Sequence, residues 1–139
     1  MADSEPLNPL KALKPAPRLI ENDRTTERII GAALHVHHEL GCGFLEAVYG
    51  WAFEIELRHR GISYQREAPM PISYRGQTMP TAYRVDFVID GVLIEFKAMR
   101  QTGTIEDAQL LNYLYANGGG VGLLLNFGEP SLGIRRFKV

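Results

Sequence analysis

Hydrophobic residues repeat at helical spacing in the first half of the chain. From Arg24 to Leu40 they fall three or four positions apart, which predicts an amphipathic helix over that range. A glycine-rich break follows, and a second apolar segment from Phe44 to about Arg60 predicts a second helix that stops at Gly61. Because this second helix is apolar on nearly every side, we expect it to be largely buried.

Short β-like segments occupy the middle of the chain. Residues 62–66, 70–74 and 78–82 are separated by prolines and a glycine, which predicts an antiparallel meander. The pair Asp90-Gly91 then separates two apolar stretches, residues 83–89 and 92–97. This pair between two strand-like runs is the strongest short hairpin signal, and it predicts a two-residue turn.

The predicted hairpin places two acids against each other. If Asp90 and Gly91 form the turn, Asp86 lies opposite Glu95, at roughly 5 Å between Cβ atoms. Like charges at that separation repel, and folding does not require them, so a divalent cation is the leading candidate for holding them together. Side chains alternate along a strand, so the two faces differ. One face carries Arg84, Asp86, Val88, Leu93, Glu95 and Lys97, and the other, expected in a core, carries Tyr83, Val85, Phe87, Ile89, Val92, Ile94 and Phe96.

The last third of the chain predicts a helix and two strands. Thr104 with Asp107 forms a capping-box pattern for a helix to about Ala116, and Gln109 and Tyr113 share one face of it. The apolar run 121–127 predicts a strand buried on both faces, and residues 132–139 predict a more polar edge strand. Glycines 118–120 follow a helix instead of preceding one, which excludes a phosphate-binding loop.

The order of elements indicates the fold class. Two helices, a group of strands with a hairpin, a helix and two further strands predict an α/β (α+β) protein with a mixed central sheet flanked by helices. The helix between Lys97 and Val121 is long enough for a parallel crossover. Residues 1–23 carry four prolines and no sustained apolar period, so we expect a disordered leader followed by one domain at residues 24–139.

Composition excludes several classes of protein. An apolar fraction of 45% and a charged fraction of 22% are ordinary for a soluble globular domain. The net charge of −1 provides no overall basic field for coating DNA, although it does not exclude a local groove. A single cysteine excludes an intramolecular disulfide and a multi-cysteine zinc site. Without a secretory signal or a membrane-length apolar run, we expect a cytoplasmic protein.

Two further groups of polar residues need an interpretation. Three histidines, at positions 35, 37 and 38, lie late in the first helix, but without a carboxylate at a defined spacing we interpret them as surface or packed residues. Glu46 leaves two alternatives open. With Gly43 as N-cap it would be the third helical residue and cap free amides. In a buried helix, by contrast, its carboxylate would need a partner.

Three motifs of the chain resemble those of a known group of enzymes. Asp86, followed by eight residues and then Glu95-Phe96-Lys97, resembles the signature of the PD-(D/E)XK nuclease superfamily, with Val85 in place of the proline. The spacing of Gln109 and Tyr113 resembles the Q-x-x-x-Y motif of its RecB-type branch. The segment Gly43–Tyr49 matches the motif of the GxxExxY family of small bacterial and archaeal proteins.

This resemblance implies a restriction-endonuclease-like αβββαβ core with a metal site. Asp86 and Glu95 would bind one or two Mg²⁺ or Mn²⁺ ions, with Glu46 and the backbone carbonyl of Phe96 as further ligands. Lys97 would position or activate the attacking water. The resemblance assigns to a last group the support of the site or contact with nucleic acid, DNA in preference to RNA: Gln109, Tyr113, Tyr49 and Arg84.

Three hypotheses follow for the acid pair. The first is a metal-dependent nuclease, and the second is a nuclease-fold module with little or no cleavage that binds nucleic acid or a protein partner. The third is a surface ladder of ion pairs in which Arg84 faces Lys97. Direct opposition of two acids disfavours the ladder, and the intact acid-acid-lysine set favours the nuclease. The small size of the chain favours targeting by a homodimer or a protein partner.

Overall fold

The computed structural model describes residues 24–139, except for the side chains of Thr81 and Ala82. The disordered leader expected at residues 1–23 lies outside the described residues. The described part forms three helices and a five-stranded sheet. The helices are α1 (Arg24–Leu40), α2 (Glu46–His59) and α3 (Thr104–Ala116), and the strands are β1 (Gln65–Tyr74), β2 (Gln77–Ile89), β3 (Val92–Lys97), β4 (Val121–Asn126) and β5 (Gly133–Lys138).

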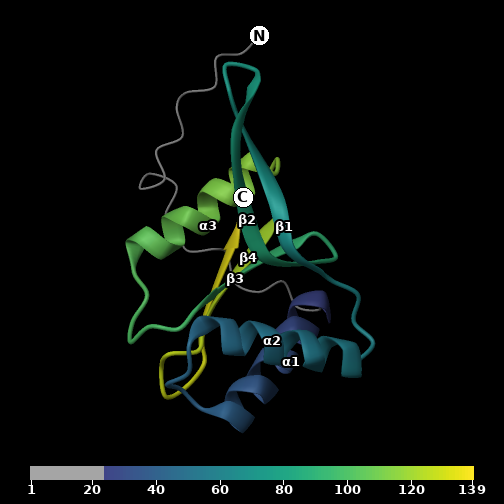
Figure 1. Cartoon of the computed structure of the whole chain (residues 1–139), viewed down its shortest axis with the longest axis vertical. Coiled ribbons are helices and arrows are strands. Elements are labelled where there is room, and N and C mark those ends of the chain that lie inside the picture. Colours follow the sequence, from purple (N-terminus) through teal and green to yellow (C-terminus); the bar gives the residue numbers. More distant parts are fainter. Residues whose placement is uncertain (1–23) are drawn as a thin grey trace.

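The sheet is mixed and has the order β1-β2-β3-β4-β5. Its first three strands are antiparallel, β3 and β4 are parallel, and β4 and β5 are antiparallel. Helix α3 provides the crossover between the parallel strands. Figure 1 shows the long β1–β2 hairpin at one end of the molecule with α3 beside it, and α1 with α2 at the other end. This architecture confirms the predicted fold class. No helix of the described residues is long and apolar enough to cross a membrane.

Two hydrophobic cores lie on the two faces of the sheet. The first joins α1 and α2 to the sheet and includes Phe87, and the second joins α3 to the sheet and includes Val85. Both residues belong to β2 and are two positions apart, so regular alternation would have put them on one face. The prediction of a single apolar face is therefore wrong for Val85. It is also wrong for Tyr83, which is 52% exposed and lies 5.9 Å, centroid to centroid, from the ring of Tyr113.

The change of face occurs at the level of Asp86 and Glu67. Arg66 pairs with Phe87 and Ala68 pairs with Val85, but the register contains no partner for the residue between them on either strand. Glu67 has a positive φ of 51°, in the left-handed region that a non-glycine residue rarely adopts. The irregularity redirects side chains, so that the two strands supply one core on one side of it and the other core on the other side.

Most predicted elements are present, but their boundaries and burial differ. Helix α1 has the predicted range, whereas α2 begins at Glu46 instead of Phe44. The expectation that α2 is largely buried is wrong, because only one stripe of it packs against the sheet. Trp51 and Ile55 are 62% and 66% exposed. Helix α3 has the predicted range, but Glu106 accepts a hydrogen bond from the Gly103 amide at 2.9 Å in place of the expected Thr104–Asp107 box.

The separate short strands predicted before the hairpin merge into the two long strands β1 and β2, except that residues 62–64 precede β1 and are not part of a strand. Prolines within them are tolerated because β1 is an edge strand, and because β3 pairs only with the last residues of β2, beyond Pro80. The two-residue turn is confirmed, since Ile89 pairs with Val92. Asp90 and Gly91 both have positive φ, as a type I′ turn requires.

A buried asparagine fixes the chain after β3. Asn126 Oδ1 accepts hydrogen bonds from the Met99 and Gly128 amides, both at 3.1 Å, and its Nδ2 donates to the Met99 carbonyl at 2.9 Å. The Phe127 amide also donates to the carbonyl of Lys97 at 2.8 Å. The strand end that carries Lys97 is therefore attached to the end of β4.

Replacing Gly128 should destabilise this attachment. In Gly128→Ala the new Cβ would overlap the backbone N and O of Met99 and lie 2.7 Å from the carbonyl carbon of Ala98. We expect a loss of about 1–3 kcal/mol in the free energy of unfolding, measured by urea denaturation. Gly31→Ala in α1 is the matched control, because its Cβ meets only Arg60 Nη1 at 3.5 Å. Equal stability of the two variants would contradict the expected clash.

Candidate active site

The acid pair takes the place of a regular backbone-paired position in the β2–β3 hairpin. The regular register between β2 and β3 ends where Phe87 pairs with Ile94. Beyond it, the Asp86 amide donates to Glu95 Oε1 at 2.9 Å, and the Phe96 amide donates to Asp86 Oδ2 at 2.7 Å. Each carboxylate therefore accepts a backbone hydrogen bond from the strand opposite its own. This exchange brings the two acids together as the sequence predicted.

Burial makes the pair difficult to ionise. Glu95 is 8% exposed and Asp86 is half-buried. Burial, and then the negative charge of Asp86, raise the pKa of Glu95 to about 8. Burial also raises the pKa of Asp86, against the opposing effects of the Phe96 amide and Lys97. At neutral pH the metal-free pair therefore retains a proton, which relieves the repulsion expected from the sequence.

Helix α2 adds a third acid from the other side of the hairpin. Glu46 is the first residue of this helix, its N-cap is Leu45, and no side chain caps the helix start. The alternative in which Glu46 is the third residue and caps free amides is therefore wrong. Desolvation and the nearby charge of Asp86 raise the pKa of Glu46. Glu46 and Asp86 also line the same pocket, so the two acids are neighbours in the structure.

Helix α3 contributes polar residues near the pair. Lys97 Nζ lies 3.5 Å from Gln109 Oε1. Burial, and then the charge of Glu95, raise the pKa of Tyr113. A groove of about 640 Å³ runs between α3 and the β1–β2 hairpin, and Gln109 and Tyr113 lie on its wall. The two residues of the Q-x-x-x-Y pattern thus lie between this groove and the acids.

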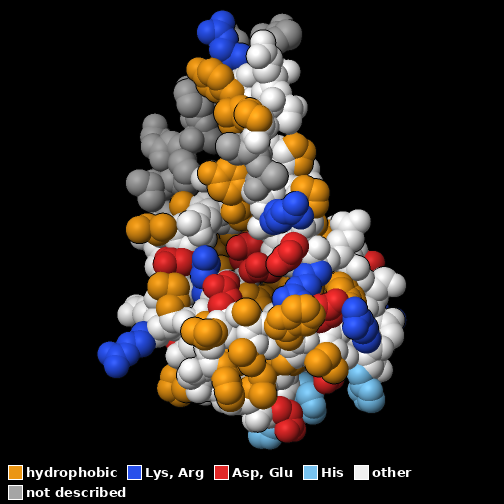
Figure 2. Space-filling model, in the orientation of Figure 1, with side chains coloured by type: hydrophobic (Ala, Val, Ile, Leu, Met, Phe, Trp, Pro, Cys, Tyr) orange, Lys and Arg blue, Asp and Glu red, His pale blue; other side chains and the backbone are white. Residues whose placement is uncertain are grey.

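A smaller pocket of about 280 Å³ opens beside the acids on the α2 side. Figure 2 shows acidic side chains gathered in a hollow below the hairpin, with basic side chains at its edge. Glu95 and Lys97 are not among the residues that line this pocket. The lining residues come from α2 and the first three strands: Glu46, Ala47, Gly50, Arg66, Glu67, Asp86, Phe87 and Phe96.

Two predicted site residues make no hydrogen bond or ion pair with the acids in the described structure. Tyr49 is fully buried, its hydroxyl donates to the Gly41 carbonyl at 2.6 Å and accepts from the Phe44 amide at 3.2 Å, and its ring stacks on Phe127. It orders the turn before Glu46 and is not available for contact with nucleic acid. Arg84 is exposed and donates to the Glu67 carbonyl at 3.2 Å.

The surface ladder of ion pairs is contradicted. Within residues 24–139, no ion pair of 4.0 Å or less includes Asp86, Glu95 or Lys97. Glu95 is buried, whereas a ladder of this kind would be on the surface. The histidines occupy packed or surface positions. His37 packs against Phe127 with Nε2 2.8 Å from the Glu129 carbonyl, and His35 lies 3.8 Å from Glu56.

The site also contains residues that the sequence did not single out. Arg66 lines the pocket, Gly50 lies beside it in α2, and Asn126 holds the loop after Lys97. A glycine inside a helical pattern is a usable signal, because it costs stability and therefore needs a packing or functional reason. Asn126 is a polar residue within an otherwise apolar run, which is a similar signal. Arg66 carries no comparable signal.

Comparison with known proteins agrees with the geometry. A family model of the PD-(D/E)XK nuclease superfamily matches residues 23–137. The chain belongs to this superfamily. No curated protein and no solved structure matches it with significant similarity.

Nucleases of the PD-(D/E)XK superfamily generally use divalent metal ions, and the donor atoms of this site fit such a cation. In the described part of the chain, no three His, Cys, Asp or Glu side chains converge into a ready-made metal site. Mg²⁺, however, often takes only one or two protein carboxylates and keeps several waters. Asp86 and Glu95 each use one oxygen in the backbone exchange, and no hydrogen bond among the described residues uses the other.

The metal-free protein should lose stability as the pH rises from about 5 to 9. Glu95 ionises near 4.5 in the unfolded chain and near 8 in the folded one, so between these values only the folded state holds the proton. Rising pH therefore favours unfolding between these two pKa values. Below the pKa of the unfolded chain Glu95 is protonated in both states, so stability no longer depends on its titration. Melting temperatures in EDTA measure this trend. In Glu95→Gln the decline should be clearly smaller, and an unchanged decline would refute the assignment of the raised pKa to Glu95.

Proposed function

We propose that this chain is a metal-dependent nuclease that hydrolyses phosphodiester bonds in DNA. The observation that carries the proposal is the pair of carboxylates held together by reciprocal backbone hydrogen bonds, beside a lysine, in a member of a nuclease superfamily. A buried acid paired with a half-buried one, both with raised pKa values and next to a pocket, is typical of a catalytic site.

The acids would hold the cation. Asp86 and Glu95 would bind Mg²⁺ or Mn²⁺ through the oxygens that remain outside the backbone exchange. Glu46 and the backbone carbonyl of Phe96, two residues that line the same pocket, would complete the set. When bound, the cation would act as a Lewis acid on the phosphate and would lower the pKa of a coordinated water.

Lys97 would position the attacking water and offset charge that develops on the phosphate. Its ammonium group lies 3.5 Å from Gln109 Oε1, and Asn126 fixes the chain directly after it. Gln109 would therefore act by orienting Lys97. Tyr113, whose phenol lies near Glu95, would steady the site or contact the nucleic-acid backbone.

Within the superfamily, we place the chain in the GxxExxY family and the RecB-type branch. Two contacts support this assignment, because each gives a motif residue a role at the site. Tyr49 orders the turn that leads to Glu46, and Gln109 contacts Lys97. We propose that residues 24–139 form one nuclease domain, that it acts in the cytoplasm, and that a homodimer or a protein partner supplies targeting.

A second candidate is a nuclease-fold module that binds nucleic acid or a protein partner with little or no cleavage. The observation that favours it is that Glu46, Asp86 and Glu95 do not converge into a ready-made three-ligand site in the described structure. Cleavage assays distinguish the two candidates.

The purified protein should cut DNA in the presence of Mg²⁺ or Mn²⁺. Asp86→Asn and Lys97→Ala should each lower the rate by about 100-fold or more, because each removes a group that binds the cation or stabilises the transition state. Lys138→Ala, at an exposed position in β5, is the matched control and should retain full activity. Equal rates in wild type and Asp86→Asn would refute the assignment, and an inactive wild type that still binds DNA would favour the binding module.

Glu46→Gln should weaken the binding of Mn²⁺, measured by calorimetry, by about 10-fold or more. Its melting temperature should change little, since no capping bond is lost. Glu56→Gln on the same helix is the control, because Glu56 pairs with Arg60 on the surface. If Glu46→Gln lowers only the melting temperature, the contribution of Glu46 is to the helix terminus and not to the metal.

A further inference from the structure

The only tryptophan of the chain, Trp51, is exposed to solvent and directly follows Gly50, which lines the pocket of Glu46 and Asp86. Trp51 is 62% exposed, although the guanidinium of Arg66 lies 4.3 Å from the centroid of its ring. The cation thus covers one face of the indole, and much of the rest of the ring remains accessible to solvent. Burying this ring would be favourable, so its exposure next to a binding pocket needs an explanation.

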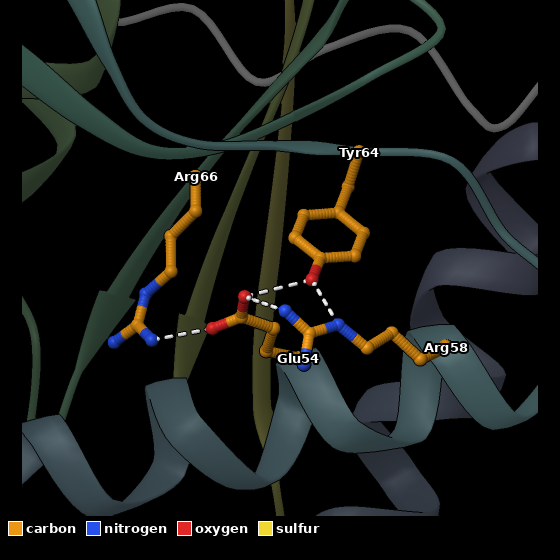
Figure 3. A network of polar contacts seen from close by, with 4 residues as sticks. All are labelled: Glu54, Arg58, Tyr64 and Arg66. Atoms are coloured by element: carbon orange, nitrogen blue, oxygen red, sulfur yellow. Dashed lines mark hydrogen bonds and ion pairs between the residues drawn. The ribbon is translucent and has the colours of Figure 1, made fainter.

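A network of polar contacts fixes Arg66. Its Nη1 donates to Glu54 Oε2 at 2.6 Å, and the other carboxylate oxygen accepts from the Tyr64 hydroxyl at 2.7 Å and from Arg58 Nη2 at 2.8 Å (Figure 3). The hydrogen bonds from Tyr64 and from Arg66 hold the pKa of Glu54 below its ordinary value, so Glu54 stays ionised. Arg66 is therefore positioned before any ligand binds, which lowers the entropy cost of binding.

A glycine in α2 makes room for this arrangement. A Cβ at Gly50 would lie 3.0 Å from Arg66 Nη2, closer than an ordinary contact. Glycine inside a helix costs about 1 kcal/mol relative to alanine, so position 50 gives up helix stability. In return, the guanidinium crosses the helix and reaches Trp51.

The pair formed by Trp51 and Arg66, here called the Trp51–Arg66 platform, adjoins the candidate catalytic residues. Arg66 and Gly50 line the same pocket of about 280 Å³ as Asp86 and Glu46. Arg66 is also close enough to lower the pKa of Asp86 in opposition to burial. A ligand whose phosphate reached the acids would therefore extend over the indole.

We infer that the Trp51–Arg66 platform stacks an unpaired base of a single-stranded nucleic acid next to the phosphate at the acids. This inference rests on the proposed function and specifies its substrate. An exposed indole stacks on any base, and Arg contacts phosphate or the ring of a base. Bases inside a duplex have both faces covered, so an intact duplex cannot use the platform. The net charge of −1 also provides no overall basic field that would attract a duplex.

Further exposed apolar residues on α2 and just before it suggest a competing use of this surface. Val48 and Ile55 lie at helical spacing from Trp51, Phe44 precedes the helix, and all three are exposed, which fits contact between two copies of the chain. The nucleic acid is favoured because a second apolar surface would not need the anchored cation of Arg66 or its link to the pocket. Self-association is an outcome that the experiment below separates.

Tryptophan fluorescence tests the inference directly, because Trp51 is its only source in the chain. In EDTA, a 12-nucleotide oligothymidine should quench the emission in a saturable manner, and a blunt duplex of the same length should not. The absence of metal prevents cleavage, so this result does not depend on nuclease activity. Quenching without any cleavage in Mg²⁺ would refute the nuclease and leave the platform intact. Cleavage in Mg²⁺ without quenching in EDTA would refute the platform and leave the nuclease assignment intact.

Variants complete the test, with binding followed by the anisotropy of a labelled oligothymidine. Trp51→Ala should weaken binding by about 5- to 150-fold, which corresponds to the loss of one stacked base. Trp51→Phe should retain part of the affinity, and Glu54→Gln, which releases Arg66, should lower it by a smaller factor. Ile55→Ala is the matched control on the same helix and should bind as wild type. Equal losses in Trp51→Ala and Ile55→Ala, together with a dimer that both variants dissociate in size-exclusion chromatography, would overturn the inference.

Discussion

The structure depends on how two backbone amides are satisfied where the ladder between β2 and β3 ends. A buried amide without a partner costs roughly 1–3 kcal/mol, so the amides of Asp86 and Phe96 need acceptors once regular pairing stops. Carboxylates provide them: Glu95 accepts from Asp86, and Asp86 accepts from Phe96. The same bonds that complete the hairpin hold two acids at close range in a partly dry environment. Fold and candidate chemistry therefore share these bonds.

The site is assembled from both faces of the sheet. Glu46 and Arg66 adjoin Asp86 from the side of α2, while on the side of α3 Tyr113 lies near Glu95 and Gln109 contacts Lys97. This arrangement is unusual for a sheet, because each strand residue normally faces only one layer. It is achieved here by the left-handed conformation of Glu67, opposite Asp86, which redirects the side chains of both strands at the level of the acids.

Local patterns in the sequence predicted much of this. The Asp90-Gly91 turn has its own backbone requirement, so the register of the hairpin and the approach of Asp86 to Glu95 could be predicted. The ranges of α1 and α3 and the parallel crossover followed from periodicity and length. The location of Val85 in the second core could not be predicted, because it depends on the conformation of Glu67 in a neighbouring strand.

Contacts between distant segments were also beyond prediction. Arg66 is an ordinary charged residue in the sequence, and its role arises from Glu54, Tyr64 and the missing side chain of Gly50. Composition of α2 suggested burial on all sides, but the sheet offers only one surface to pack against, which left Trp51 in solvent. Glu46 was placed two residues too far into its helix because the turn before it is closed by Tyr49 and not by a glycine cap.

The division of β2 between two cores has a mechanical consequence. Val85 is fixed among the residues of α3, and Phe87 is fixed among those of α1 and α2. Asp86 is the single residue between them, so packing on both faces of the sheet fixes its position in the strand. A change in the packing of either core would therefore be transmitted to Asp86 and would alter its position relative to Glu46 on α2. The stability of the two cores and the geometry of the acidic site are thus coupled.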